Sequence, residues 1–394
     1  MTNLPQGWEW KSLGEICFIT DGTHKTPNYI ETGIPFLSVK NISKGFFDLS
    51  DVKYISLEEH NKLIKRAKPE FEDILICRIG TLGKAIKISL EFEFSIFVSL
   101  GLLKPKIKII SDYLVYFLNS YFIEGWINDN KVGGGTHTAK LNLNILEKCP
   151  IALPPLKEQE RIVGILDESF AKIDESIKIL EQDLLNLDEL MQSALQKAFN
   201  PLKDNAKENY KLPQSWEWKS LEEISENISA GGDKPKNCTE SKTAKNQIPV
   251  YANGVNNNGL VGYTDKATII KPSLTISARG TIGFVCIRKE PYFPIVRLIS
   301  LIPCENILCL HYLYFCLNFF IAKGEGSSIP QLTIPKFKSL QIPLPPIKEQ
   351  EQITSHLDEL SSHVKNLKQN YQAQIKDLQE LKNSLLDKAF KGNL

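Results

Sequence analysis

Residues 4–16 read LPQGWEWKSLGEI, and residues 212–224 read LPQSWEWKSLEEI, a difference at two of thirteen positions. A second stretch, LPPLKEQERI at 153–162, returns as LPPIKEQEQI at 344–353. Self-similarity over such a distance indicates that the chain is built from two copies of one structural unit. The two copies decide the fold, and the rest of the sequence is interpreted from them.

The end of each copy is fixed in length. The tripeptide KAF at 197–199 returns at 388–390, and this pair has the same offset of 191 residues as the two LPP stretches. Between these marks most residues differ while their number is unchanged. Constant length with changed sequence predicts a rigid spacer, so each half is expected to be a variable globular domain followed by a length-fixed segment.

The fixed segments carry the heptad pattern of a coiled coil. Apolar residues alternate in steps of four and three, Pro155 and Pro346 fit the first turn of a helix, and Pro201 fits its end. At 1.5 Å per residue each helix would be about 60 Å long. Antiparallel pairing within the chain is favoured over two separate dimers. The expected seams are Leu166, Phe170, Ile173, Ile177, Leu180, Leu184, Leu187, Met191, Ala194 and Ala198, and Leu357, Leu360, Val364, Leu367, Tyr371, Gln374, Leu378, Leu381 and Leu385.

The variable segments are predicted to be mixed α/β domains. Short apolar runs bounded by turn residues indicate strands at 34–39, 73–76 and 274–277, and one amphipathic helix is expected at 111–126 and another at 306–322. Antiparallel helices would give the chain pseudo-two-fold symmetry. The expected division is a first domain at 1–155, a helix at 156–199, a linker at 200–211, a second domain at 212–346 and a helix at 347–390.

The composition is that of an ordinary globular protein. Hydrophobic residues make up 42% of the chain and charged residues 24%, which excludes intrinsic disorder. The formal net charge of +1 is far from the strongly basic balance of a simple nucleic-acid binder. The charge is uneven, however, because residues 156–199 carry five basic and ten acidic side chains, whereas residues 200–346 carry 17 basic and 12 acidic ones. The helix would repel phosphate and the second domain would attract it.

The sequence predicts a cytoplasmic protein without a membrane segment. Its eight cysteines include no CxxC pair and several lie in apolar runs, as expected of reduced, packed thiols. The N-terminus has no basic segment followed by an apolar core. The one stretch that resembles a membrane span, 307–322, is shorter than the roughly 20 residues required and contains His311 and Asn318. A buried helix is expected there.

Signatures of catalysis are absent from the sequence. HExxH, GxSxG and the Asn/Asp-Pro-Pro-aromatic motif of adenine methyltransferases do not occur, and the six histidines are scattered. The run GTLGKA at 80–85 has the wrong spacing for a phosphate-binding loop and lacks the hydroxyl residue after its lysine. We therefore expect a chain that is not an enzyme, with no metal site and no cofactor of its own.

Polar loops in both halves have the chemistry of a DNA-binding surface. DGTHKTP at 21–27 and GGGTHT at 133–138 combine hydroxyl and imidazole groups, the first with a lysine, and AGGDKPK at 230–236 and YANGVNNNG at 251–259 hold a similar place in the second half. Such groups suit phosphates and base edges, and asparagine can bind adenine through N6 and N7. The candidate DNA-binding residues are Thr23, His24, Lys25, Thr26, Arg78, Thr81, Lys84, Thr136, His137, Lys234, Lys236, Tyr251, Asn253, Asn256, Asn257, Arg279 and Thr281.

Each of these loops has a simpler interpretation. A polar loop taken alone is most often a solvated turn. The sequence RGTIG at 279–283, and the related run from Arg78, can also be a tight turn whose arginine anchors a carboxylate. Both interpretations of the two arginines stay open on the sequence.

In its doubled order of motifs, the chain resembles the specificity subunit of Type I restriction-modification systems. The resemblance rests on WEW at 8–10 and 216–218, on LPPxKEQE from 153 and from 344, on the DGTHKTP loop and on the two long helices, and it covers essentially the whole chain. It implies two target recognition domains, each of which reads one half of a split DNA sequence. It also implies that the helices set the spacing of the half-sites and dock modification subunits. The short tandem repeats that tune the spacer in some relatives are absent, so the spacer length stays unpredicted.

The resemblance further implies a non-catalytic subunit with several partners. These are double-stranded DNA, modification (methyltransferase) subunits and restriction (translocase/endonuclease) subunits, with S-adenosylmethionine, ATP and Mg used by the partners. Given the near-neutral charge, the partners are expected to supply much of the phosphate affinity and this chain the choice of sequence. Two other classes stay open: a stand-alone DNA-modifying enzyme with an unrecognised active site, and a coiled-coil adaptor that binds only proteins.

Overall fold

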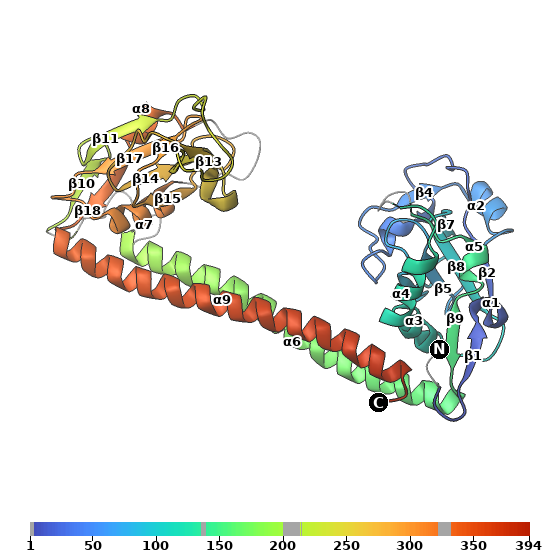
Figure 1. Ribbon diagram of the computed structural model, residues 1–394. Helices are drawn as coiled ribbons and strands as arrows, with labels where there is room; N and C mark the ends of the chain where they lie inside the picture. The colour runs from blue at the N-terminus through green and yellow to red at the C-terminus, as the bar shows by residue number, and fades with distance from the viewer. Residues whose placement is uncertain (1–3, 135–138, 200–212, 214, 322–331) are drawn as a thin grey trace. The chain divides into compact units, whose positions relative to one another are not determined.

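The chain forms two compact units in a computed structural model that describes residues 4–134, 139–199, 213, 215–321 and 332–394. The first unit contains the residues up to 180 together with 373–394, and the second contains 181–372. Each unit therefore holds one globular domain and a part of both long helices (Figure 1). The expected linker at 200–211 lies outside the described residues.

The first domain combines three sheets with short helices. A four-stranded antiparallel sheet has the order β2-β8-β5-β6, a three-stranded sheet has the order β4-β3-β7, and β1 pairs with β9. Its elements are β1 (Glu9–Ser12), α1 (Leu13–Ile16), β2 (Cys17–Asp21), β3 (Ile34–Leu37), η1 (Val39–Asn41), β4 (Lys53–Ile55), α2 (Leu57–Leu63), β5 (Ile74–Cys77), β6 (Ala85–Lys87), β7 (Ser95–Ile96), β8 (Leu100–Pro105), α3 (Ser111–Leu118), α4 (Tyr121–Asn130), α5 (Leu143–Leu146) and β9 (Pro150–Leu153), followed by the long helix α6 (Leu156–Phe199).

The second domain repeats this plan. Its four-stranded sheet has the order β11-β17-β14-β15, its three-stranded sheet has the order β13-β12-β16, and β10 pairs with β18. The mixed α/β fold expected for both domains is confirmed. The elements are β10 (Glu217–Ser220), β11 (Ser225–Ala230), β12 (Ile248–Tyr251), η3 (Asn256–Gly259), β13 (Leu260–Thr264), β14 (Ser273–Ile276), β15 (Val285–Arg288), β16 (Phe293–Pro294), β17 (Ile299–Pro303), α7 (Leu310–Phe320), α8 (Ile334–Lys338) and β18 (Gln341–Leu344), followed by the long helix α9 (Ile347–Phe390).

The repeated WEWKSL stretch forms the first strand of each domain and the turn after it. In the first domain β1 pairs antiparallel with β9, the strand that leads into α6. Ser12 then closes a capping box, because its backbone N–H donates to the Glu15 carboxylate at 2.6 Å while the Glu15 N–H donates to Ser12 Oγ at 3.3 Å. Ser220 and Glu223 repeat both contacts in the second domain. The repeat is thus explained by one local structure used twice.

The glutamine of each KEQE stretch joins a long helix to its domain. Gln159 is buried, accepts the Ile110 N–H at 3.0 Å through Oε1 and donates to the Pro154 carbonyl at 2.9 Å. Gln350 makes the corresponding contacts with Cys309 and Pro345 at 2.8 Å each. Because each amide satisfies buried backbone groups on two segments, it fixes the direction in which the helix leaves the domain.

The phenylalanine of each KAF tripeptide packs into a domain rather than ending in solvent. Phe390, at the end of α9, contacts the rings of Tyr113 and Phe117 in the first unit, with centroids 5.7 and 4.9 Å apart. Phe199, at the end of α6, contacts the ring of Tyr312 in the second unit at 5.4 Å. Each domain core is therefore completed by the end of the helix that follows the other domain.

The two 44-residue helices pair antiparallel, as expected. In the first unit Lys382 of α9 forms an ion pair with Asp174 of α6, and in the second unit Lys368 pairs with Asp188. Early residues of one helix thus meet late residues of the other in both units. The side-by-side course of α6 and α9 is visible in Figure 1.

The expected seam of α9 is wrong at three positions. Leu367 and Leu381 are 39% and 45% exposed and Gln374 is also exposed, whereas Lys368, Ile375 and Lys382 turn inward. After Val364 the seam advances by four and then three residues, whereas the expected pattern advanced by three and then four. Tyr371, Leu378 and Leu385 therefore lie in the seam as expected, and each position between them was placed one residue too early. Lysine can occupy such a position because its aliphatic stem packs while its ammonium group reaches an aspartate of the partner helix.

One of the two shorter helices expected from the sequence is divided, and the other is found as expected. The single helix expected at 111–126 is two helices, α3 and α4, because the chain breaks where the Asn119 amide bonds the backbone of Ala85 and Ser120 caps α4. The stretch 307–322 contains the buried helix α7. In the part of the chain that the structure describes, no helix is long and apolar enough to cross a membrane.

Candidate nucleic-acid interface

The polar loops of the first domain come together at one edge of its four-stranded sheet. Strands β2 and β5 end there and β8 begins there, since β8 is antiparallel to both. The loops are joined by backbone hydrogen bonds: the Val98 N–H donates to the Thr23 carbonyl at 3.0 Å, and the Arg78 N–H donates to the Ser99 carbonyl at 2.9 Å. The loops at 21–26, 78–83 and 97–99 therefore lie side by side at this edge, and their exposed residues form the loop surface of the first domain.

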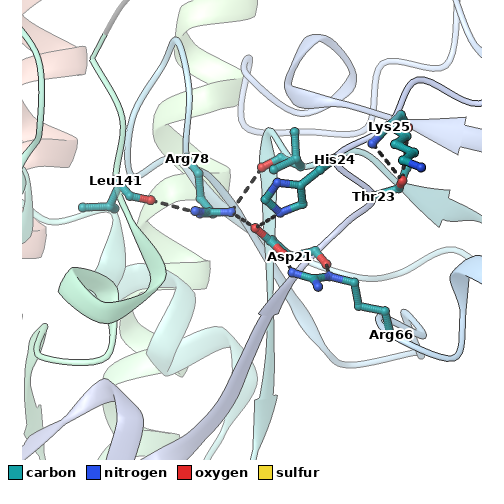
Figure 2. A network of polar contacts seen from close by, with 8 residues as sticks. Asp21, Thr23, His24, Lys25, Arg66, Arg78 and Leu141 are labelled. Atoms are coloured by element: carbon teal, nitrogen blue, oxygen red, sulfur yellow. Dashed lines mark hydrogen bonds and ion pairs between the residues drawn. The ribbon is translucent and has the colours of Figure 1, made fainter.

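A buried carboxylate ties this surface together. Asp21, whose side chain is 2% exposed, accepts hydrogen bonds from the guanidinium groups of Arg66 and Arg78, and His24 Nε2 lies 3.1 Å from its Oδ2 (Figure 2). Arg78 Nε also donates to the Leu141 carbonyl at 2.9 Å. The network links the strand end at Asp21 to three other segments of the domain, so it fixes the loops relative to one another.

The charge state of Asp21 follows from its surroundings. Burial alone would raise the pKa of its carboxyl group, but the hydrogen bonds and charges of Arg66 and Arg78 outweigh burial and lower the pKa below its ordinary value. Asp21 is therefore ionised at neutral pH and balances part of the charge of the two arginines. The cluster is a structural ion network with a net positive charge.

The structure corrects the expectation that Arg78 contacts DNA. Its side chain is 10% exposed, and its guanidinium group is engaged with Asp21 and with the carbonyls of Leu141 and Val98. The geometry is that of an arginine that anchors a carboxylate, which was one of the two interpretations of this turn. Arg78 supports the loop surface from below instead of facing a ligand.

Most of the other candidate residues that the structure describes in the first domain are exposed. His24, Lys25, Thr26 and Thr81 are exposed, while Lys84 is half-buried. The hydroxyl of Thr23 accepts the Lys25 N–H at 3.2 Å and donates to the Lys25 carbonyl, so it shapes the turn. Thr136 and His137 lie outside the described residues.

The loops of the second domain meet at the equivalent edge. Strands β11 and β14 end there and β17 begins there. The Val296 N–H donates to the Gly232 carbonyl at 2.9 Å. In both domains the chain passes so close that only glycine fits: a Cβ on Gly22 would lie 2.0 Å from the Ile96 carbonyl oxygen, and one on Gly231 would lie 2.6 Å from the Pro294 carbonyl carbon.

The structure also corrects the expectation that the Asn253 amide binds a base. Its Oδ1 accepts the Ala278 N–H at 3.0 Å and its Nδ2 donates to the Val296 carbonyl at 2.6 Å, so both ends of the amide that was expected to grip adenine are engaged with the backbone. Asn253 joins the loops at 253–259, 278–283 and 295–297. Like Asp21 in the first domain, it holds the surface together from within.

Tyr251 has one face of its ring covered, and its contact with DNA stays a prediction. The ring is half-buried and lies beneath the guanidinium group of Arg288, whose Cζ is 3.6 Å from the ring centroid. Its ring face is therefore occupied by a side chain of the same domain.

The exposed residues of this edge form a cationic surface. Lys234, Lys236 and Arg279 are exposed, and none of them has an ion-pair partner among the described residues. Asn256, Asn257 and Thr281 are exposed beside them. Positive charge next to amide and hydroxyl groups is the chemistry that binds phosphates and base edges.

Two arginines of these surfaces were missed by the sequence interpretation. Arg66, whose side chain is 54% exposed, binds Asp21 and adds charge to the first surface. Arg297 is exposed with a positive φ of 57°, and its N–H donates to the Gly231 carbonyl at 3.0 Å. Arg66 stands in the basic run KRAK at 65–68, which could have drawn attention, whereas Arg297 stands alone in an apolar stretch.

Comparison with known proteins decides the family. The family model of the Type I restriction modification DNA specificity domain matches residues 5–184 and again residues 213–377. The chain belongs to this family. Both copies found in the sequence are thus members of one domain family, and the expected specificity subunit is confirmed.

Relatives and solved structures agree with this membership. A protein of Mycoplasma pneumoniae, named as a candidate type I specificity subunit, is 32% identical over 227 residues, which cover 56% of this chain and 58% of that protein. The StySPI specificity subunit of Salmonella potsdam is 24% identical over 99% of this chain and 90% of its own length.

The fold of the family is shared over the full length. A solved chain from a study of complex assembly and conformational transition of the type I R-M system has a TM-score of 0.83 at 21% identity, with all of both chains covered. The HsdS subunit from Thermoanaerobacter tengcongensis has a TM-score of 0.61 at 22% identity and covers 100% of this chain and 99% of its own. These two likenesses establish the specificity-subunit fold.

Proposed function

We propose that this chain is the DNA specificity subunit of a Type I restriction-modification system, in which each domain selects one half of a split target. The observation that carries the proposal is the match of the DNA specificity family to both halves of the chain. Each matched half carries a loop surface at the same sheet edge, with exposed groups able to contact phosphates and bases. The chain contributes sequence selection and no catalytic group.

The partners follow from the same proposal. Modification subunits would dock on the long helices, restriction subunits would join the assembly, and S-adenosylmethionine, ATP and Mg would serve those partners in the cytoplasm. The helices support a docking role because apolar side chains outside the seam face solvent: Ile179, Leu185 and Leu190 are 55%, 58% and 48% exposed. A subunit docked on the helices would remove these apolar side chains from water.

Methylome sequencing tests the function directly. Cells that produce this chain with its modification subunits are expected to carry adenine methylation in a split motif, and deletion of this chain should abolish that methylation. Activity of the pure chain on DNA without partners would overturn the proposal in favour of a stand-alone enzyme. Absence of salt-dependent duplex binding would favour the adaptor that binds only proteins, because a DNA binder releases counterions through its phosphate contacts.

The assignment of one half-site to each domain is tested by matched variants. His24→Ala with Lys25→Ala is expected to weaken selection of one half-site, and Lys234→Ala with Arg279→Ala should weaken selection of the other. Equal loss on both halves of the target in either variant would contradict the assignment.

Docking on the helices is tested by charge reversal. Glu175→Lys and Glu181→Lys are the cleaner changes, because Glu168 already forms an ion pair with Lys172 at 2.6 Å. Both variants should weaken co-purification of the modification subunits. Unchanged assembly would count against these faces as the docking surface.

A further inference from the structure

Among its described residues, the second domain buries a cation without an acidic partner. Arg288 is 8% exposed, and no carboxylate of a described residue lies within 4 Å of its guanidinium group. Its Nε donates to the Thr275 hydroxyl at 3.0 Å, its Nη2 donates to the Asn258 carbonyl at 2.6 Å, and its Cζ lies over the Tyr251 ring. Of the residues that the structure describes, only neutral groups therefore contact this buried charge.

The first domain shows that the fold does not need this arrangement. The strands at 74–87 and 274–287 have the same pairing with an offset of 200 residues, so Arg288 corresponds to Ile88 and Thr275 to Leu75. Strand pairing also matches Ser300 with Leu102. In the first domain all three positions are filled by buried aliphatic side chains. The polar set replaces a hydrophobic core that is sufficient for the same topology.

Such a replacement is costly unless it serves another purpose. Burying a guanidinium group removes its hydration, and neutral acceptors restore that loss only in part. The planar fork of arginine is suited to joining two acceptors while it stacks on an aromatic ring. What the arrangement provides is a hydrogen bond from Arg288 that fixes the position of the Asn258 carbonyl.

That carbonyl belongs to a turn in an unfavourable backbone conformation. Asn257 and Asn258 have φ values of 48° and 52°, two consecutive left-handed residues that are not glycine. The turn closes on itself through the bond from the Ala252 N–H to the Gly259 carbonyl at 2.8 Å. At its tip the side chains of Asn256 and Asn257 are exposed, and neither has a hydrogen-bond partner in the described parts of the chain.

We infer that Arg288 is a specificity-determining positioning residue of the second domain, which holds the Asn256–Asn257 turn ready to read bases of one half-site. Arg288 acts from below: its stacking on Tyr251 and its bond to Thr275 fix the guanidinium group, and the guanidinium group fixes the turn. A turn that is already ordered loses less conformational entropy when it binds DNA. The resulting gain in binding free energy applies only to the base that fits this fixed geometry. This inference rests on the proposed function.

The test compares Arg288→Met with its counterpart in the first domain, Ile88→Met. Both variants are made in the full chain, produced with the modification subunits, and assayed by methylome sequencing. Arg288→Met is expected to relax the motif at one or two positions of one half-site, with a loss of discrimination of about 5- to 100-fold, and to leave the other half-site unchanged. Ile88→Met should leave both half-sites unchanged.

Further variants separate positioning from general stability. Arg288→Lys keeps the charge and one donor, so it should restore part of the stringency, and Asn257→Ala should relax the same positions as Arg288→Met. A sharp, unchanged motif in Arg288→Met overturns the inference, as does equal relaxation of both half-sites. If Arg288→Met does not fold, unchanged stringency in both Arg288→Lys and Asn257→Ala overturns it. Absence of a split motif for the unaltered chain would defeat the proposed function instead.

Discussion

The two domains share one strand plan and hold their loop edges together with different chemistry. The first domain uses a buried ion network centred on Asp21 and Arg78. The strand pairing places Ala230 and Ala278 at the equivalent positions of the second domain, where Asn253 joins the loops instead. The sheet therefore does not depend on any particular network at its edge, so the edge is free to vary.

The parts that attach the domains to the helices differ little between the two units. The capping boxes, the buried glutamines and the terminal phenylalanines occur in both copies with nearly the same contacts. A change in these contacts would alter how a helix leaves its domain, whereas a change at the loop edge alters only what the edge presents. The repeated sequence therefore marks the attachment, and the diverged sequence lies at the loop edge that we propose as the selection surface.

The largest expected effect comes from breaking the network that only the first domain has. Asp21→Ala leaves Arg78 buried without its counter-charge and should destabilise the chain by about 3–5 kcal/mol in urea unfolding. The double variant Asp21→Ala with Arg78→Ala recreates the alanine pair of the second domain and should recover much of this loss. A double variant no more stable than the single one would contradict the view that the edge tolerates either solution.

A smaller loss of stability, equal in the two units, is expected at the buried glutamines that both domains share. Gln159→Leu and Gln350→Leu each leave buried backbone groups without partners, and each should cost about 2 kcal/mol in urea unfolding. Gln182→Leu, an exposed glutamine on α6, is the matched control and should change stability by less than about 0.5 kcal/mol. A clear difference between the two buried variants would show that the attachments are not equivalent.

Lowering the pH should reduce the contribution of Asp21 to the stability of the first domain. Because the pKa of Asp21 is lower in the folded chain than in the unfolded chain, its ionised form stabilises the fold above the ordinary aspartate pKa of about 4. This stabilisation is lost as the pH falls through the lowered folded-state value. Urea unfolding at pH 7 and pH 3 should show a steeper loss for the unaltered chain than for the Asp21→Ala, Arg78→Ala double variant, and equal losses would refute this role of Asp21.

The smallest effect is expected at the ion pairs between the helices. Lys382→Ala in the first unit and Lys368→Ala in the second each remove one partly exposed pair with an aspartate of α6. Each should cost less than about 1 kcal/mol, and the cost should shrink further in high salt. A larger cost in one unit, measured by urea unfolding at low and high salt, would show that the two seams are not alike.

Much of the fold could be predicted from the repeats and the periodicity. Residues 274–277 were expected to be a strand because an apolar run stood between turn residues, and α6 followed from its heptads. The α9 seam failed at Leu367 because leucine spacing alone does not reveal that Lys368 can fill a seam position when an aspartate stands opposite it. The break at Asn119 was hidden because its cause, a contact with Ala85, lies far away in the sequence.

The candidate site could be predicted less well than the fold. The polar loops lie together at one sheet edge in each domain, and their contact with DNA stays a prediction, whereas Arg78 and Asn253 hold the loops from within and Tyr251 packs against Arg288. Arginine and asparagine have the same donors and acceptors whether they face a ligand or a buried carbonyl. Arg288 gave no signal because it begins a short charged run, RKE at 288–290, and such a run is most often exposed to solvent.

Duplication of the chain, two α/β domains, two long antiparallel helices and the resemblance of both halves to one family could all be inferred from the amino-acid sequence. These properties depend on repeats, periodicity and motif order, which are local or countable along the chain. Only the tertiary structure decided which polar side chains face outward and which hold the loops, because that choice depends on partners such as Asp21 and Arg78, 57 residues apart. Burial is a property of the folded surroundings, and no residue carries it in its own identity.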